Sequence, residues 1–130
     1  MNRAIEIHDS TLDSLALRDG LLVLHFSSAY IHESKGVPGV DAGSGWVQEA
    51  YLKIGGVEIV GSFSELPHDL SDGHIKLGDT VHENMIPVPL DHDGEVYLRL
   101  EKLHEVVSIK GTSAKLELVG EATYVEEFRP

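Results

Sequence analysis

LDSLALRDGLLVLHFSSAYI, residues 12–31, decides the fold. Two apolar-rich runs, Leu12–Arg18 and Leu21–Ile31, flank the dipeptide Asp19-Gly20, which is a strong short-range signal for a β-hairpin. A two-residue loop there sets the two runs against each other, and directly opposed residues share a face of the sheet. A slip of one residue would scramble this sorting, so the register is well specified. The predicted apolar face contains Leu15, Leu17, Leu22, Leu24 and Phe26.

A second hairpin is predicted in Ile86–Leu100. The tripeptide His92-Asp93-Gly94 suits a three-residue loop that ends in a left-handed glycine, and this loop again sorts the apolar residues onto one face. Pro87 and Pro89 remove two backbone donors from the same flank of the first strand. The segment Ile86–Leu90 is therefore expected to be a sheet edge.

A third hairpin is predicted near the C-terminal end. Its strands are Leu103–Lys110 and Lys115–Val125, joined by a turn at Gly111–Ala114. Residues 95–108 also fit the period of an amphipathic helix. Strands are favoured, with a turn or bulge near Lys102–His104, because the flanking hairpins require extended chain.

The middle of the chain adds further strands. Trp46–Ile54 alternates, a Gly-Gly pair leads into Val57–Phe63, and His74–Leu77 forms a short strand. The one long irregular stretch is the Gly-rich segment Glu33–Gly45, expected to be a flexible crossover or a functional loop. Together the segments predict one all-β domain over residues 1–130, an antiparallel β-sandwich or flattened β-barrel of about 8–10 strands.

The charge balance restricts the classes of partner. The 130 residues include 22 Asp+Glu against 10 Lys+Arg, a net charge of −12, and no cysteine. Such a surface repels phosphate backbones and excludes nucleic acid as the expected partner, while it attracts basic proteins. The simpler interpretation is that the acidic charge only keeps the protein in solution. The first residues contain no apolar run typical of a signal peptide, so none is expected, and no apolar run approaches the length of a membrane span. The absence of cysteine fits a cytoplasmic protein.

Three groups of residues are candidates for ligand or metal sites. His68, Asp72 and His74 carry side chains that bind zinc or iron, although their spacing matches no established pattern and a plain loop is favoured. Trp46, at the end of the Gly-rich segment, could stack on a small molecule, although a core or rim anchor is the commoner role. His25 lies in an alternating strand and could face the interior. No cofactor is expected.

The segment His8-Asp9-Ser10 contains the residue types of a hydrolytic triad. Adjacent residues of an extended chain point to opposite faces, so the three cannot form a relay among themselves, and Asp9 or Ser10 is expected to close a turn. The same alternation places Glu126 and Glu127 on opposite faces, which argues against paired-carboxylate hydrolysis.

Two segments resemble a known group of proteins. Glu6-Ile7-His8-Asp9-Ser10-Thr11-Leu12 resembles the opening of small, mostly uncharacterised bacterial β-proteins, several of which are immunity proteins of toxin systems. The ending Gly120–Phe128, with Tyr124-Val125-Glu126-Glu127-Phe128, resembles how such chains finish. The resemblance implies an all-β, cytoplasmic, non-enzymatic protein, with His8 and Asp9 as the expected shared site.

These observations leave three functional hypotheses. The leading one is a non-enzymatic interaction module that meets a basic protein partner. The second is a β-barrel that binds a small molecule near the Gly-rich segment and Trp46. The third, less favoured, is a metal-dependent enzyme that uses His68, Asp72 and His74. Edge strands also allow a homo-oligomer through sheet extension, although Pro87 and Pro89 protect one flank.

Overall fold

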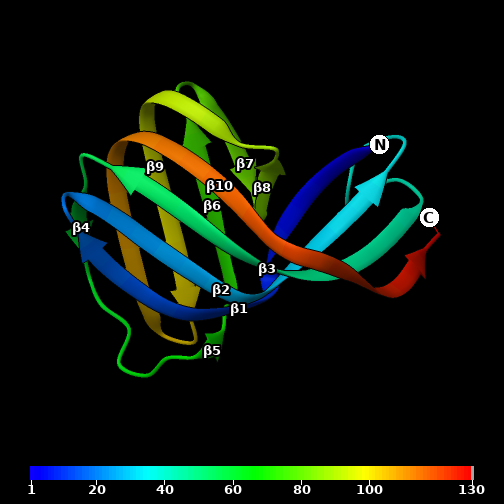
Figure 1. The fold of residues 1–130 in the computed structure, drawn as a ribbon, viewed down its shortest axis with the longest axis horizontal. Coiled ribbons are helices and arrows are strands. Elements are labelled where there is room, and N and C mark those ends of the chain that lie inside the picture. The colour runs from blue at the N-terminus through cyan, green and yellow to red at the C-terminus, as the bar shows by residue number, and fades with distance from the viewer. Residues whose placement is uncertain (130) are drawn as a thin grey trace.

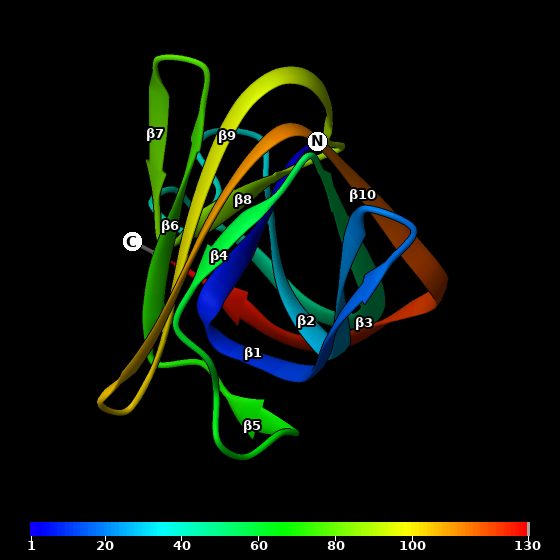
Figure 2. The same cartoon turned by 90° about the vertical axis from the view of Figure 1, so that its left-hand side faces the viewer.

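The prediction of an all-β fold is confirmed. The computed structural model describes residues 1–129, and Pro130, the last residue of the predicted domain, lies outside the described residues. Within them the chain forms one antiparallel sheet that curls into a half-barrel, with no helix that could cross a membrane (Figures 1 and 2). Its ten strands are β1 (Asn2–Arg18), β2 (Leu21–Ser34), β3 (Gly43–Gly55), β4 (Glu58–Val60), β5 (His68–Asp69), β6 (Asp72–Leu77), β7 (Thr80–Glu83), β8 (Met85–Val88), β9 (Asp91–Lys102) and β10 (Glu105–Phe128).

Four long strands form the frame of the molecule. The order in the sheet is β5-β1-β2-β3-β10-β9-β6-β7, with β8 paired to β1 and β4 paired to β10. Figure 1 shows β1, β2, β3 and β10 running across the whole width of the view, and both chain termini lie at its right-hand end. In the left half of that view β6 and β9 cross behind these strands, and Figure 2 shows β6, β7 and β9 on the side opposite β2 and β3. The first and last strands therefore reach the same end of the molecule.

The first hairpin has the predicted register. Leu15 pairs with Leu24 and Leu17 with Leu22, and Asp19 and Gly20 have φ of 52° and 76°. Two positive φ values identify the type I′ turn that suits the twist of a hairpin. Leu22, Leu24 and Phe26 are buried in the core as expected. Leu17 is 60% exposed, because it lies at the tip of the hairpin, beyond the packed centre.

The second hairpin prediction is wrong. Asp93 pairs with Ser113 inside the β9–β10 ladder, so His92-Asp93-Gly94 lies in a strand rather than in a loop. The ladder shifts register between Gly111 and Ser113, opposite this tripeptide, and Gly94 supplies a φ of 146° that other residues rarely adopt. The edge prediction holds, since β8 pairs only with β1 in the described chain.

The third hairpin prediction is also wrong, because β10 runs without a turn through Gly111–Ala114. Gly111 is there for close packing: a Cβ on it would lie 2.4 Å from Ile54 Cγ2. The turn predicted near Lys102–His104 is confirmed: it lies at Leu103-His104, where Leu103 has φ of 56°, and it joins β9 to β10. Residues 95–108 are thus extended around a turn, as favoured over a helix.

The middle segments are strands of unequal length. Trp46–Ile54 lies in β3 and His74–Leu77 in β6, while Val57–Phe63 contributes only the short strand β4. Strands β2 and β3 extend far into the predicted Gly-rich loop, so that only residues 35–42 lie outside them. The backbone of this loop is tied down: Asn2 Nδ2 donates to Gly36 O at 2.7 Å.

The long strands have an apolar inner face and a polar outer face. Inner-face residues such as Leu24, Leu52 and Leu98 belong to one continuous core. The residues that alternate with them along each strand point outward. We define the outer face by residues of β1, β2, β3 and β10, with the bends that carry them: Glu6, Asp9, Asp13, His25, Tyr30, His32, Gly45, Glu49, Tyr51 and Glu126.

Candidate functional site

Polar and aromatic side chains from three strands meet on the outer face at the end of the molecule that holds the termini. Glu6 pairs with Tyr30, while Gly45 of β3 lies between His32 of β2 and Glu126 of β10. Tyr30 and His32 are only 8% and 7% exposed, which is unusual for polar rings on the face opposite the core. We call this group the Tyr30–His32 cluster: Glu6, His8, Asp9, Tyr30, His32, Glu126 and Phe128.

A bulge in β1 brings His8 and Asp9 to the cluster. Pairing with β2 is interrupted between Glu6 and Thr11, and Asp9 has φ of 79°. Ser10 closes the bulge, since its Oγ donates to Glu6 O at 2.6 Å and accepts from Tyr30 N at 3.0 Å. The prediction that Asp9 or Ser10 closes a turn between two strands is therefore wrong, because β1 continues through both residues and only bulges there.

The bulge also corrects the prediction that His8 and Asp9 point to opposite faces. His8 Nδ1 lies 3.1 Å from Asp9 Oδ1, and both side chains are more than half exposed. The strict alternation of a strand fails where an extra residue is inserted. Asn84, which lies between β7 and β8, also holds the bulge in place, because its Oδ1 accepts a hydrogen bond from His8 N at 2.8 Å. The hydroxyl of Ser10 is occupied by backbone groups, so no Ser–His–Asp relay forms.

Tyr30 is held as a neutral hydrogen-bond donor. Its hydroxyl donates to Glu126 Oε1 at 2.5 Å. Burial, together with the negative charges of Glu126, Glu6 and Asp9, raises the pKa of Tyr30 well above the ordinary tyrosine value. Glu126 and Glu127 pair with Gly45 and Ser44 in succession, so they face opposite sides as predicted.

His32 is buried beside a carboxylate and an aromatic ring. Its Nε2 is hydrogen-bonded to Glu6 Oε2, and its ring centroid lies 4.6 Å from that of Phe128. Its Nδ1 has no hydrogen-bond partner among the described residues. Tyr30 and His32 are two residues apart on one strand, a spacing that places both on one face and that sequence reasoning overlooked.

Gly45 makes room for the cluster. A Cβ at this position would lie 2.2 Å from the Tyr30 hydroxyl and 3.0 Å from Phe128 Cε2. Real Cβ atoms do not approach other atoms so closely, so a side chain here would displace both rings. One glycine of the Gly-rich segment is thus explained by close approach, not by flexibility.

A second histidine lies farther along the outer face. His25 Nε2 lies 2.6 Å from Glu49 Oε2, its Nδ1 lies 3.3 Å from Asp13 Oδ2, and its ring stacks on Tyr51 with centroids 4.5 Å apart. His25 therefore faces outward and links carboxylates of β1 and β3, which corrects the expectation of an interior histidine.

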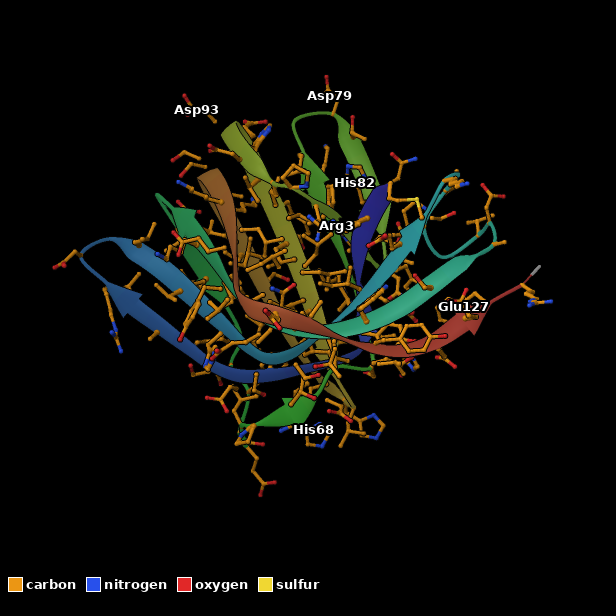
Figure 3. All side chains as sticks on the ribbon, turned by 45° about the vertical axis from the view of Figure 1, so that its right-hand side comes forward. Arg3, His68, Asp79, His82, Asp93 and Glu127 are labelled. Carbon is orange, nitrogen blue, oxygen red and sulfur yellow. The ribbon has the colours of Figure 1, made fainter. Side chains whose placement is uncertain are left out.

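The residues of the proposed metal site do not come together. In the described chain, the one set of three ligand atoms within 4.8 Å of each other belongs to Glu6, His8 and Asp9, not to His68, Asp72 and His74. His68 Nδ1 is bonded to the carbonyl of Asp69, and the ring of His74 stacks on Tyr97. Figure 3 shows His68 projecting below the sheet on β5.

Trp46 does not belong to the cluster either. It pairs with Ile31 and Tyr124, and it packs partly against the core, so it lies on the face opposite Tyr30 and His32. Its indole Nε1 donates to Ser44 Oγ at 2.8 Å. The role of an anchor at the rim of the core explains these contacts.

One surface hollow does lie beside the loop 35–42. Its volume is about 430 Å³, and Trp46 is not part of its lining. Val37, Val40 and Met85 supply apolar surface, while Asn2, Arg3, His82 and Glu83 supply polar groups. Arg3 and His82 lie near each other in Figure 3. The small-molecule hypothesis placed a site near the Gly-rich segment and Trp46. A hollow does lie beside this segment, but Trp46 does not line it.

Comparison of the chain with protein-family models, with curated proteins and with solved structures found no match. The assignment of function therefore depends on the geometry of the outer face.

Proposed function

We propose that this protein is a non-enzymatic interaction module that binds a basic protein partner through its outer face. The observation that carries this proposal is the set of carboxylates contributed by β1, β3 and β10 to one surface. They are Glu6, Asp9, Asp13, Glu49 and Glu126.

These carboxylates meet histidine and tyrosine instead of lysine or arginine. Among residues 1–129 the Lys and Arg side chains form ion pairs at Glu117, Glu101 and Glu105, none of which belongs to this set. Tyrosine carries no positive charge and histidine carries none that is permanent, so these carboxylates have no lysine or arginine beside them to balance their negative charge. Lysine and arginine side chains of a partner would supply the missing charge and would speed the encounter.

The site is better suited to recognition than to catalysis. The hydroxyl of Ser10 is engaged by the backbone, and Tyr30 is held protonated by its surroundings. Asp9, by contrast, is 56% exposed and available to a partner. We propose that the protein acts in the cytoplasm in the manner of an immunity protein, whose acidic surface covers a basic target; the cysteine-free sequence fits that compartment.

Calorimetric titration with a lysine- and arginine-rich peptide tests the proposal. The triple variant Asp9→Asn, Asp13→Asn, Glu49→Gln should bind the peptide about tenfold more weakly than the native protein, because interfacial charge pairs govern such complexes. Native binding should also weaken as salt is raised, since screening shortens the reach of exposed charges.

The matched control neutralises the same number of acids elsewhere. Asp79, Asp93 and Glu58 are exposed, and Figure 3 places Asp79 and Asp93 on tips at the top, away from Glu127. The variant Asp79→Asn, Asp93→Asn, Glu58→Gln should bind like the native protein. Equal losses in the two variants, or no binding at all, would refute recognition by the outer face.

A second candidate function is supported by the hollow beside the loop 35–42. Its volume of about 430 Å³ falls in the range of small-molecule sites. Arg3 lies at its wall without a carboxylate ion pair in the described chain, so a small carboxylate with an aliphatic tail suits it. Octanoate should bind saturably to the native protein and not to Arg3→Gln, with Arg18→Gln as the control. Equal binding to both variants would exclude the hollow.

A further inference from the structure

The C-terminal half of β10 is an open sheet edge. Strand β9 pairs with β10 only as far as Lys115, and β4 covers only Ser108–Lys110. Beyond Leu116, whose N–H donates to Leu90 O at 2.9 Å, β3 is the only strand paired with β10 in the described residues. We call Glu117–Phe128 the free edge. The ladder with β3 shifts register between Val119 and Thr123 and between Tyr124 and Glu126, so the segment is not a regular strand throughout. The unpaired backbone donors and acceptors on its other side are still a template for another strand.

The free edge is exposed on both faces as well as along its side. The nine residues Val119–Glu127 are all exposed, whereas the part of β10 that pairs with β9 contains the buried residues Val107, Ile109 and Ala114. Val119, Tyr124 and Val125 are 39%, 49% and 45% exposed. These apolar side chains would pack against a partner strand, in the way that cross-strand pairs stabilise a sheet.

Charge decides which strand fits. The free edge carries Glu117, Glu121, Glu126 and Glu127 and no lysine or arginine. Two copies paired through this edge would oppose like charges, which destabilises a ladder. A strand with lysine or arginine at alternate positions would instead meet the carboxylates of β10 itself, with Glu126 on the outer face.

We propose that the free edge of β10 binds its partner by strand addition, taking a basic β-strand as the next strand of the sheet. This inference rests on the proposed function and adds the mode of recognition. Main-chain hydrogen bonds would supply affinity, and the acidic side chains would select the partner strand by charge.

A short peptide that alternates lysine and valine is the probe, with hydrogen exchange of the protein followed by mass spectrometry. Binding should slow amide exchange within Val119–Phe128. Two further peptides carry N-methyl groups on one or the other set of alternate residues. Alternate N–H groups point to opposite edges of a strand, so one methylated peptide should lose binding while the other keeps it.

A charge reversal on the protein gives a second readout. Glu121→Lys should weaken peptide binding about tenfold, whereas Asp79→Lys makes the same change in charge at an exposed turn and should leave binding unchanged. If the peptides bind without protection of Val119–Phe128, or if both methylated peptides bind like the parent, strand addition is wrong and the proposed function stands. If no basic peptide binds, the proposed function itself fails.

Discussion

Replacing Gly45 by alanine should disrupt the Tyr30–His32 cluster while the core stays intact. The new Cβ would lie 2.2 Å from the Tyr30 hydroxyl, 2.8 Å from its Cζ and 3.0 Å from Phe128 Cε2. The two rings cannot both keep their places, because all three distances are shorter than or at the limit of real Cβ contacts. The hydrogen bond from Tyr30 to Glu126 should be the first interaction lost.

The expected magnitude follows from two terms. Overpacking a filled site costs about 1–3 kcal/mol. Losing a hydrogen bond to a charged group costs about 1.5–3 kcal/mol, toward the low end here because Glu126 is exposed and regains water. We expect Gly45→Ala to lower the free energy of unfolding by about 2–4 kcal/mol, which corresponds to a fall in Tm of roughly 10 °C for a chain of this size.

A double-mutant cycle measured by urea denaturation separates the two terms. Tyr30→Phe removes the nearest clashing atom and the hydrogen bond together, so Gly45→Ala should cost about 1–2 kcal/mol less in that background. Gly20→Ala, where a Cβ has no atom within 4 Å, reports the cost of filling a glycine position that has a positive φ without steric overlap. A Gly45→Ala loss below about 0.5 kcal/mol, or strict additivity with Tyr30→Phe, would show that the cluster is not tightly packed.

Three further predictions concern the core and the titrating groups. Phe26→Ala should cost about 3–5 kcal/mol in urea denaturation because the ring is fully buried, whereas Leu17→Ala, at the exposed hairpin tip, should cost less than about 1 kcal/mol. The raised pKa of Tyr30 means that the unfolded chain ionises first, so its stability contribution is intact below about pH 10 and is lost as the pH rises further. The pKa of the exposed Tyr124 is also raised, so absorbance at 295 nm should show tyrosine that ionises late, and Tyr30→Phe should remove the part of that signal that comes from Tyr30. A hydrogen bond from Lys102 lowers the pKa of Glu105 in the folded protein. The ionised Glu105 therefore stabilises the fold above the ordinary glutamate pKa, and this stabilisation is lost as the pH falls through the pKa of the folded state. In urea denaturation at a series of acidic pH values, Glu105→Gln should reduce the dependence of the free energy of unfolding on pH.

The parts of the fold that the sequence predicted correctly depend on local chemistry. Asp19-Gly20 can supply the two positive φ values that a tight hairpin requires, so its register follows from adjacent residues alone. Pro87 lacks a donor wherever it lies, so the edge position of β8 needs no knowledge of its neighbours.

The errors arose where the same residues serve a distant partner. Gly94 and Gly111 look like turn residues in the sequence. In the structure Gly94 lies in β9 across from a shift in the register of β10, and Gly111 makes room for Ile54 of β3. A glycine that permits close approach and a glycine that permits a turn have the same local signature. Only the tertiary pairing distinguishes them.

The candidate site was harder to predict than the fold because it joins the two ends of the chain. Glu6 and Glu126 approach the same pair of rings only because β1 and β10 both reach the right-hand end of the sheet in Figure 1. The segments that suggested a family resemblance at each end of the sequence are the ones that meet there. His8 and Asp9 come together through a bulge, which breaks the alternation that sequence reasoning uses to assign faces. A surface assembled by an irregularity in one strand and by pairing between the chain ends leaves no periodic signal. Only the three-dimensional arrangement reveals this surface.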